Sequence, residues 1–117
     1  VADTRSSPAE TVARALLERG ARVAYHDPLV PRWEEMPELA AIQDAAEALR
    51  GADIVIVCLP DVRYRESLPP LLVERLARGA IVVDPWNLVA PAAAEGLARR
   101  GIALEVFGRG DLPRARP

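Results

Sequence analysis

Apolar positions in this chain follow two spacings that take turns along the sequence. Short uninterrupted apolar runs, such as residues 54–59, are separated by segments in which apolar residues recur every three or four positions. The first pattern is typical of strands buried on both faces, and the second of amphipathic helices. The two patterns predict helices over residues 8–19, 44–50, 68–78 and 91–100, and strands over 22–26, 53–59, 81–83 and 103–107.

Helices that alternate with short β-branched strands predict an α/β fold with a Rossmann-like, doubly wound parallel sheet. A glycine stands between each predicted helix and the next strand, where a left-handed residue commonly ends a helix (Gly20, Gly51, Gly79 and Gly101).

A sheet of this kind begins with a central strand, and no strand pattern precedes the first predicted helix. We therefore expect the first central strand to lie upstream of residue 1, in a longer enzyme. Residues 1–107 are then one domain, and 108–117 a frayed polar tail. The proline-containing segment 27–43 is longer than an ordinary connection and is expected to wrap an edge of the domain.

Composition narrows the possible functions. The 117 residues carry a formal net charge of −2 and show no basic stripe, which argues against nucleic acid or an anionic membrane as a partner. The longest apolar run, 54–60, is too short to span a bilayer. Cys58 is the single cysteine, so neither an internal disulfide nor a zinc site is expected, and a cytoplasmic location fits best.

The beginning of the chain is rich in polar groups. Ser7, Pro8 and Glu10 predict the N-cap, the first turn and the capping box of a helix. Arg5 stands two residues before the cap, where helical N–H groups also favour an anionic ligand. The alternative is that Asp3 and Arg5 are an exposed pair beside a helix start.

Polar residues also follow the predicted strands, at the edge of a parallel sheet where ligands bind. Trp86 can stack on a flat ring, and Asp84 and Asn87 can hydrogen-bond to it. Trp86 can equally fill a gap between loops. Asp61 and Arg63 follow another strand and are either part of this edge or an ordinary surface pair.

Three other residues are interpreted structurally. We expect Asp27 to cap the turn at Pro28, and His26 to be a solvated histidine without metal-binding neighbours. Cys58 lies in the most apolar strand and is interpreted as a small buried hydrophobe, not a nucleophile. No metal site and no catalytic residue are predicted, and the glycine fingerprint of dinucleotide-binding folds is absent from the sequence.

Several motifs occur together in one order and spacing. They are Asp3-Thr4-Arg5-Ser6-Ser7-Pro8-Ala9, Gly20-Ala21-x-Val23, Tyr25-His26-Asp27-Pro28, Ala52-Asp53 and Val83-Asp84-x-x-Asn87. Over residues 1–107 the chain resembles the C-terminal, UDP-binding domain of the nucleotide-sugar 6-dehydrogenases, the UDP-glucose/GDP-mannose dehydrogenase family. The run at 25–31 leans toward the branch that oxidises UDP-N-acetylhexosamines.

The resemblance implies an enzyme of polysaccharide biosynthesis that uses NAD to oxidise the C6 alcohol of a UDP-sugar to a carboxylate, in two steps through a thioester. Its NAD-binding domain, its catalytic Cys and Lys, and a central region that forms a homo-oligomer lie outside this chain. This chain alone is then expected to be inactive. The resemblance gives Arg5 a role in NAD binding, and Asp84, Trp86 and Asn87 a role in substrate binding. Trp86 stands where the family usually has Arg.

Two alternatives stay open. Trp86 in place of Arg favours a non-catalytic Rossmann-like binding or assembly module with a decayed nucleotide pocket. A different NAD(P)-dependent reductase with a similar sheet is the weaker alternative.

Overall fold

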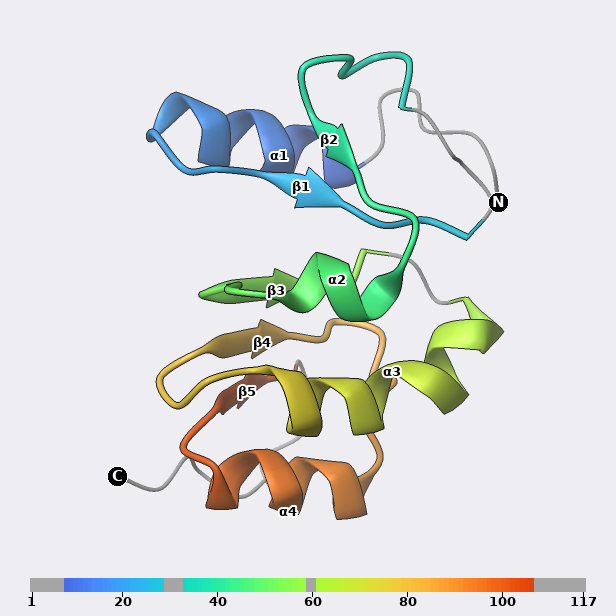
Figure 1. Cartoon of the computed structure of the whole chain (residues 1–117), viewed down its shortest axis with the longest axis vertical. Coiled ribbons are helices and arrows are strands. Elements are labelled where there is room, and N and C mark those ends of the chain that lie inside the picture. Colours follow the sequence, from blue (N-terminus) through green and yellow to red (C-terminus); the bar gives the residue numbers. More distant parts are fainter. Residues whose placement is uncertain (1–7, 29–32, 59–60, 107–117) are drawn as a thin grey trace. The chain divides into compact units, whose positions relative to one another are not determined.

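A computed structural model describes residues 8–28, 33–58 and 61–106. The chain forms two compact units, Val1–Ala48 and Leu49–Pro117, called unit 1 and unit 2 below (Figure 1). Both units are built of helices and parallel strands, which confirms the predicted α/β class.

Unit 1 is built around one amphipathic helix and a short strand pair. Helix α1 (Pro8–Glu18) leads to strand β1 (Ala24–Tyr25), which pairs in parallel with β2 (Ala40–Ala41). Its core consists of few side chains from the helix and the long connection (Ala13, Trp33, Met36 and Leu39). The ring of Tyr25 packs edge-on against Trp33, with 5.4 Å between ring centroids.

The segment after β1 differs from its prediction. We expected residues 27–43 to be only a long connection, but they end in β2, which is followed directly by α2 (Ala45–Leu49). Two alanines carry no strand-like pattern, so the pairing of β2 with β1 had no signal in the sequence. Asp44 caps the start of α2, because its Oδ1 accepts a hydrogen bond from the N–H of Ala46 at 3.2 Å.

Unit 2 follows the predicted alternation throughout. Its elements are β3 (Ile54–Ile56), α3 (Val62–Arg75), β4 (Ile81–Val83), α4 (Pro91–Arg99) and β5 (Ala103–Glu105). The strands pair in the order β3-β4-β5, all parallel, so their carboxyl ends lie at one edge of the sheet.

The two helices α3 and α4 pack on the same face of this sheet. Val55, Val82 and Leu104 are aligned across the three strands and belong to one apolar cluster with both helices. On the other face of the strands, Ile54 and Ile81 are 51% and 38% exposed. The core of unit 2 therefore lies between the sheet and this helix pair.

Helix α3 begins earlier than the sequence suggested. We expected it to start at residue 68. That prediction is wrong: Asp61 is the N-cap, and Pro69 and Pro70 lie inside the helix. The other three predicted helices agree with the structure to within one residue at each end. The four glycines before the strands have positive φ values, as predicted.

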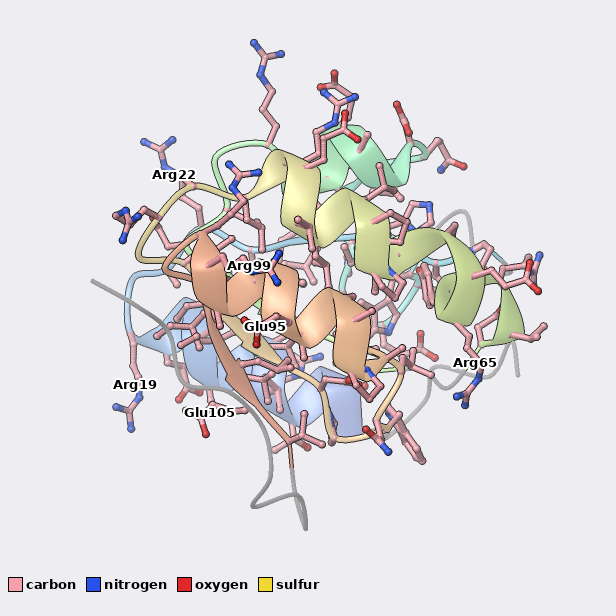
Figure 2. The ribbon with its side chains drawn as sticks, turned by 90° about the horizontal axis from the view of Figure 1, so that it is seen from below. Arg19, Arg22, Arg65, Glu95, Arg99 and Glu105 are labelled. Atoms are coloured by element: carbon pink, nitrogen blue, oxygen red, sulfur yellow. The ribbon has the colours of Figure 1, made fainter. Side chains whose placement is uncertain are left out.

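Helices α3 and α4 are also joined by polar contacts. The guanidinium group of Arg100, just after α4, donates hydrogen bonds to the carbonyl oxygens of Val73 and Leu76 near the end of α3. On α4 itself, Arg99 and Glu95 are one turn apart (Figure 2), and 3.5 Å separates Nε of Arg99 from Oε1 of Glu95. Among the helices described, none is long and apolar enough to cross a membrane.

Candidate functional site

The loop between β4 and α4 is a rigid turn built around Asp84. The backbone N–H of Asp84 donates to the carbonyl of Glu105 on β5 at 2.8 Å, so the start of the loop is tied to the sheet. The carbonyl of Asp84 accepts from the N–H of Asn87 at 3.3 Å, which closes a β-turn with Pro85 and Trp86 at its two central positions. The carboxylate of Asp84 then accepts from the N–H of Val89 at 2.9 Å.

Asp84 is fully buried, although the sequence suggested a residue that touches a ligand. Its Oδ2 holds Val89, while its Oδ1 has no hydrogen-bond partner among the residues that the structure describes. A buried carboxylate oxygen without a donor is costly. Asp84 therefore holds the loop together from its buried side, and its Oδ1 is an acceptor that no described group uses.

Trp86 and Asn87 form the exposed tip of this loop. Trp86 is 47% exposed, and Asn87 is exposed with φ of 58°. This left-handed backbone conformation is one that Asn tolerates better than most residues. Together the proline, the turn hydrogen bond and the Asp84 carboxylate fix a large aromatic side chain at the surface.

A second loop reaches the same edge of the sheet, between β3 and α3. The carboxylate of Asp61 accepts hydrogen bonds from the backbone N–H of Arg63 at 2.8 Å and, along one edge of its guanidinium group, from Nε and Nη2 at 3.0 Å each. The Arg63 side chain and then its backbone N–H lower the pKa of Asp61 from its usual value. The charge of Arg63 is thus largely engaged by its own neighbour.

The start of α4 adds backbone N–H groups to this edge of the sheet. The sequence did not predict them as part of the site. The N-cap of α4 is Ala90, which has no side-chain oxygen, and Pro91 follows at the first helical position. The backbone N–H groups of the first turn therefore lack a side-chain cap within the described residues. The pair Ala90-Pro91 is the sequence feature that indicates these uncapped N–H groups, because neither residue has a side chain that can cap a helix.

The remaining predicted residues fall elsewhere. Arg5 lies outside the described residues. In unit 1, the Nε2–H of His26 donates to the carbonyl of Gln43 at 3.1 Å, so this ring is hydrogen-bonded within the fold, not merely solvated. Cys58 is partly buried, and burial raises the pKa of its thiol, which disfavours the nucleophilic thiolate. In the ranges 8–28, 33–58 and 61–106, no three metal-ligating side chains come together.

Comparison with known families identifies the domain. Residues 1–91 match the UDP-glucose/GDP-mannose dehydrogenase family, UDP binding domain. The chain belongs to this family. The match confirms the resemblance seen in the motifs, and it includes the whole loop from Asp84 to Val89. No curated protein matches the chain. The family consists of NAD-dependent dehydrogenases, and the domain in question is the one that binds UDP.

Proposed function

We propose that this UDP-binding domain holds the UDP-sugar substrate of an NAD-dependent nucleotide-sugar 6-dehydrogenase, with Trp86 and Asn87 in contact with the nucleotide. The single observation that carries the proposal is the rigid turn at 84–89, which lies within the family match and exposes an aromatic ring at the carboxyl edge of the sheet. Ligands of open α/β sheets bind at that edge.

The chemistry of the turn favours the base of the nucleotide over its diphosphate. Trp86 stands where the family usually has Arg, so a charged donor is replaced by a flat aromatic surface suited to stacking on uracil. The cation Arg63, which follows the neighbouring strand β3, is bonded to Asp61 through Nε and Nη2 of its guanidinium group. The Asn87 amide can both donate to and accept from the polar edge of a base.

In the reaction, this chain contributes binding and orientation. NAD⁺, bound outside this chain, would accept one hydride in each of the two oxidations that convert the sugar C6 alcohol, through the aldehyde level and with one water, to the carboxylate. The cysteine and lysine that the resemblance implies for these steps lie outside this chain. Arg5, by the same resemblance, contacts NAD.

Isothermal titration of the full-length protein with UDP and with uridine tests the binding role. Trp86→Ala removes the stacking surface, and loss of one base-stacking contact costs about 1–3 kcal/mol, so the Kd for both ligands should rise about 5- to 150-fold. Val62→Ala is the matched control, because Val62 is an apolar side chain 69% exposed at the start of α3. Equal affinities in all three proteins would contradict the role of Trp86.

Activity is tested on the same full-length protein. NADH absorbance should rise when a UDP-sugar and NAD⁺ are supplied together, and not with either alone. If the protein binds UDP but turns over no UDP-sugar, the binding role stands and the dehydrogenase role is contradicted.

Trp86 in place of Arg also supports the second candidate, a binding module whose nucleotide pocket has decayed. The variant Trp86→Arg distinguishes the two. If the nucleotide pocket has decayed through the loss of Arg at this position, Trp86→Arg restores an interaction with the nucleotide and UDP affinity rises. If the indole itself binds the base, affinity falls, as it does in Trp86→Ala.

A further inference from the structure

Helix α3 contains two consecutive prolines in its interior, Pro69-Pro70. A proline has no N–H, so the carbonyls four positions earlier, at residues 65 and 66, receive no helical hydrogen bond from them, and each ring also crowds one of these carbonyls. Ser67 disturbs the same stretch, because its Oγ donates to the carbonyl of Arg63 at 2.6 Å, a contact that often bends helices. The hydrogen-bond ladder of α3 is therefore interrupted in its middle.

The part of α3 after the prolines is fixed in the core of unit 2. Leu72 is fully buried, and Leu76, which caps the helix, is 1% exposed. A Cβ atom on Gly96 of α4 would lie 3.3 Å from the side chain of Val73, so the two helices approach each other closely at this point. Arg100 adds hydrogen bonds to the carbonyls of Val73 and Leu76.

The part before the prolines, residues 62–68, is held by fewer side chains and is called the flap below. Tyr64 and Leu68 are buried, whereas the other five residues of the flap are exposed. In Figure 1 the first turns of α3 extend past the carboxyl ends of β3 and β4, and its last turns lie beside α4. One helix thus joins a well-packed part to a part with two anchoring side chains, and the join is where the ladder is interrupted.

The flap is also connected to the candidate site. Tyr64 and Leu68 belong to the same buried cluster as Leu88 and Val89, two residues of the Asp84 loop. The N–H of Val89 is the donor that the Asp84 carboxylate holds at 2.9 Å. Strands β3 and β4 are neighbours, so the flap and this loop follow adjacent strands at one edge of the sheet. The docked flap therefore contributes to the packing beneath the exposed tip of the loop.

We propose that the flap is a hinged element of the nucleotide site, which opens at Pro69-Pro70 separately from the rest of α3, and that nucleotide bound at Trp86 and Asn87 favours its docked state. A ligand shifts such an equilibrium only if it binds one state better. The docked state has that advantage, because it supports the rigid turn at 84–89. The hinge rests on α3 alone, whereas the coupling to the ligand rests on the proposed function.

Amide hydrogen exchange of the full-length protein without ligand tests the hinge. A helical segment of seven residues is not stable on its own in water, so an open flap loses its internal hydrogen bonds. After correction for intrinsic exchange, the amides of residues 65–68 should therefore exchange at one common rate, at least about tenfold faster than those of residues 73–75. Ordinary fraying would instead give rates that fall gradually along α3, and such a gradient would overturn the hinge.

Proline variants show whether the prolines set this boundary. Pro69→Ala/Pro70→Ala supplies N–H donors for the carbonyls at 65 and 66, so exchange of residues 65–68 should slow at least about tenfold. Pro70→Ala alone changes an exposed position and should slow it about threefold or more. Pro91→Ala is the matched control and should leave these rates unchanged, because a proline at the first position of α4 interrupts no helical bond. Equal rates in the wild-type protein and both α3 variants would overturn the hinge.

The coupling is tested by repeating the measurement with saturating UDP. Exchange of residues 65–68 should slow at least about tenfold, because UDP stabilises the docked state. If calorimetry shows that UDP binds but these rates are unchanged, the coupling is overturned and the proposed binding role stands. If UDP does not bind, the proposed function and the coupling fail together, and the rates in the free protein still decide the hinge.

Discussion

Units 1 and 2 are both built of helices and parallel strands but differ in how many apolar side chains they bury. Among the residues that the structure describes, the cluster in unit 2 contains thirteen buried residues, whereas that in unit 1 contains four. In unit 2 each helix connects two strands of one sheet and has that sheet to pack on. In unit 1 the sheet is two residues long on each strand, and the buried Nε1 of Trp33 lacks a partner among the described residues. The difference indicates that completeness of the strand–helix–strand unit, more than local helix or strand preference, decides where a stable core forms.

The largest effect should come from removing a core side chain of unit 2. Leu72 on α3 is fully buried, and Leu72→Ala is expected to lower the free energy of unfolding by about 2–5 kcal/mol, because it removes buried methyl groups and leaves a cavity. Urea denaturation of the wild-type protein and the variant measures this loss.

Met36→Ala in unit 1 is the matched substitution, since Met36 is 1% exposed. If unit 1 opens on its own, this variant should speed amide exchange around β1 and β2 and leave Val82 in β4 protected. Equal loss of protection in both units would show that they unfold together, and the contrast between them would then have no energetic meaning.

The second largest effect concerns the carboxylate inside the Asp84 loop. Asp84→Ala leaves the buried N–H of Val89 without its acceptor, which should cost about 1–3 kcal/mol of stability. Asp84→Asn keeps an acceptor for Val89 and should cost less. Thermal denaturation distinguishes the two variants.

The same pair of variants bears on the ligand. The unused Oδ1 of Asp84 either accepts a hydrogen bond when nucleotide binds or has no role in binding. In the first case Asp84→Asn weakens UDP binding although the fold is intact, because an amide N–H₂ replaces the acceptor. Unchanged UDP affinity in Asp84→Asn would restrict Asp84 to holding the turn.

Much of unit 2 could be predicted from sequence because its signals are local. Strand 81–83 and helix 91–99 were expected nearly at their observed bounds, since a β-branched run and a proline at the first helical position are short-range patterns. The start of α3 was missed because Pro69-Pro70 resembles a first turn, whereas the true cap, Asp61, is recognisable only through its bonds to Arg63. Tertiary packing of Leu68 and Leu72 outweighs the cost of prolines inside the helix.

The candidate site was predictable in its position but not in the roles of its residues. The carboxyl edge of a parallel sheet follows from fold class, so Asp84, Trp86 and Asn87 could be named in advance. That Asp84 points inward while Trp86 points outward depends on the turn closed by Asn87 and on the bond to Val89. Those contacts join residues three and five positions apart, and periodicity does not encode them. β2, with only two alanines, illustrates the same limit in unit 1.

A smaller effect should come from the arginine that joins α3 and α4. Arg100→Met removes the hydrogen bonds to the carbonyls of Val73 and Leu76 and a positive charge at the end of α3, for an expected loss of about 1 kcal/mol. Arg99→Met is the adjacent control, because Arg99 is exposed and, within the described part of the chain, its ion pair is with Glu95 on its own helix; it should cost at most about 0.5 kcal/mol. Denaturant midpoints of the two variants measure the difference. Equal midpoints would mean that the stability of unit 2 comes from its apolar cluster alone.

The smallest effect should be the pH dependence contributed by Asp61. Its pKa is lowered in the folded protein by the Arg63 side chain and backbone N–H, whereas in the unfolded chain an Asp titrates near about 3.9. A lowered folded pKa means that the stabilisation is fully present above the unfolded value and is lost as pH falls through the folded one. Melting temperatures of the wild-type protein should therefore decrease more steeply below about pH 4 than those of Asp61→Asn, which keeps a capping oxygen but has no carboxyl to protonate. Arg63→Met should reduce the same slope while Asp61 stays in place, since it removes the principal cause of the shift. Parallel curves for all three proteins below that pH would show that the ion pair at the start of α3 does not stabilise unit 2 in solution.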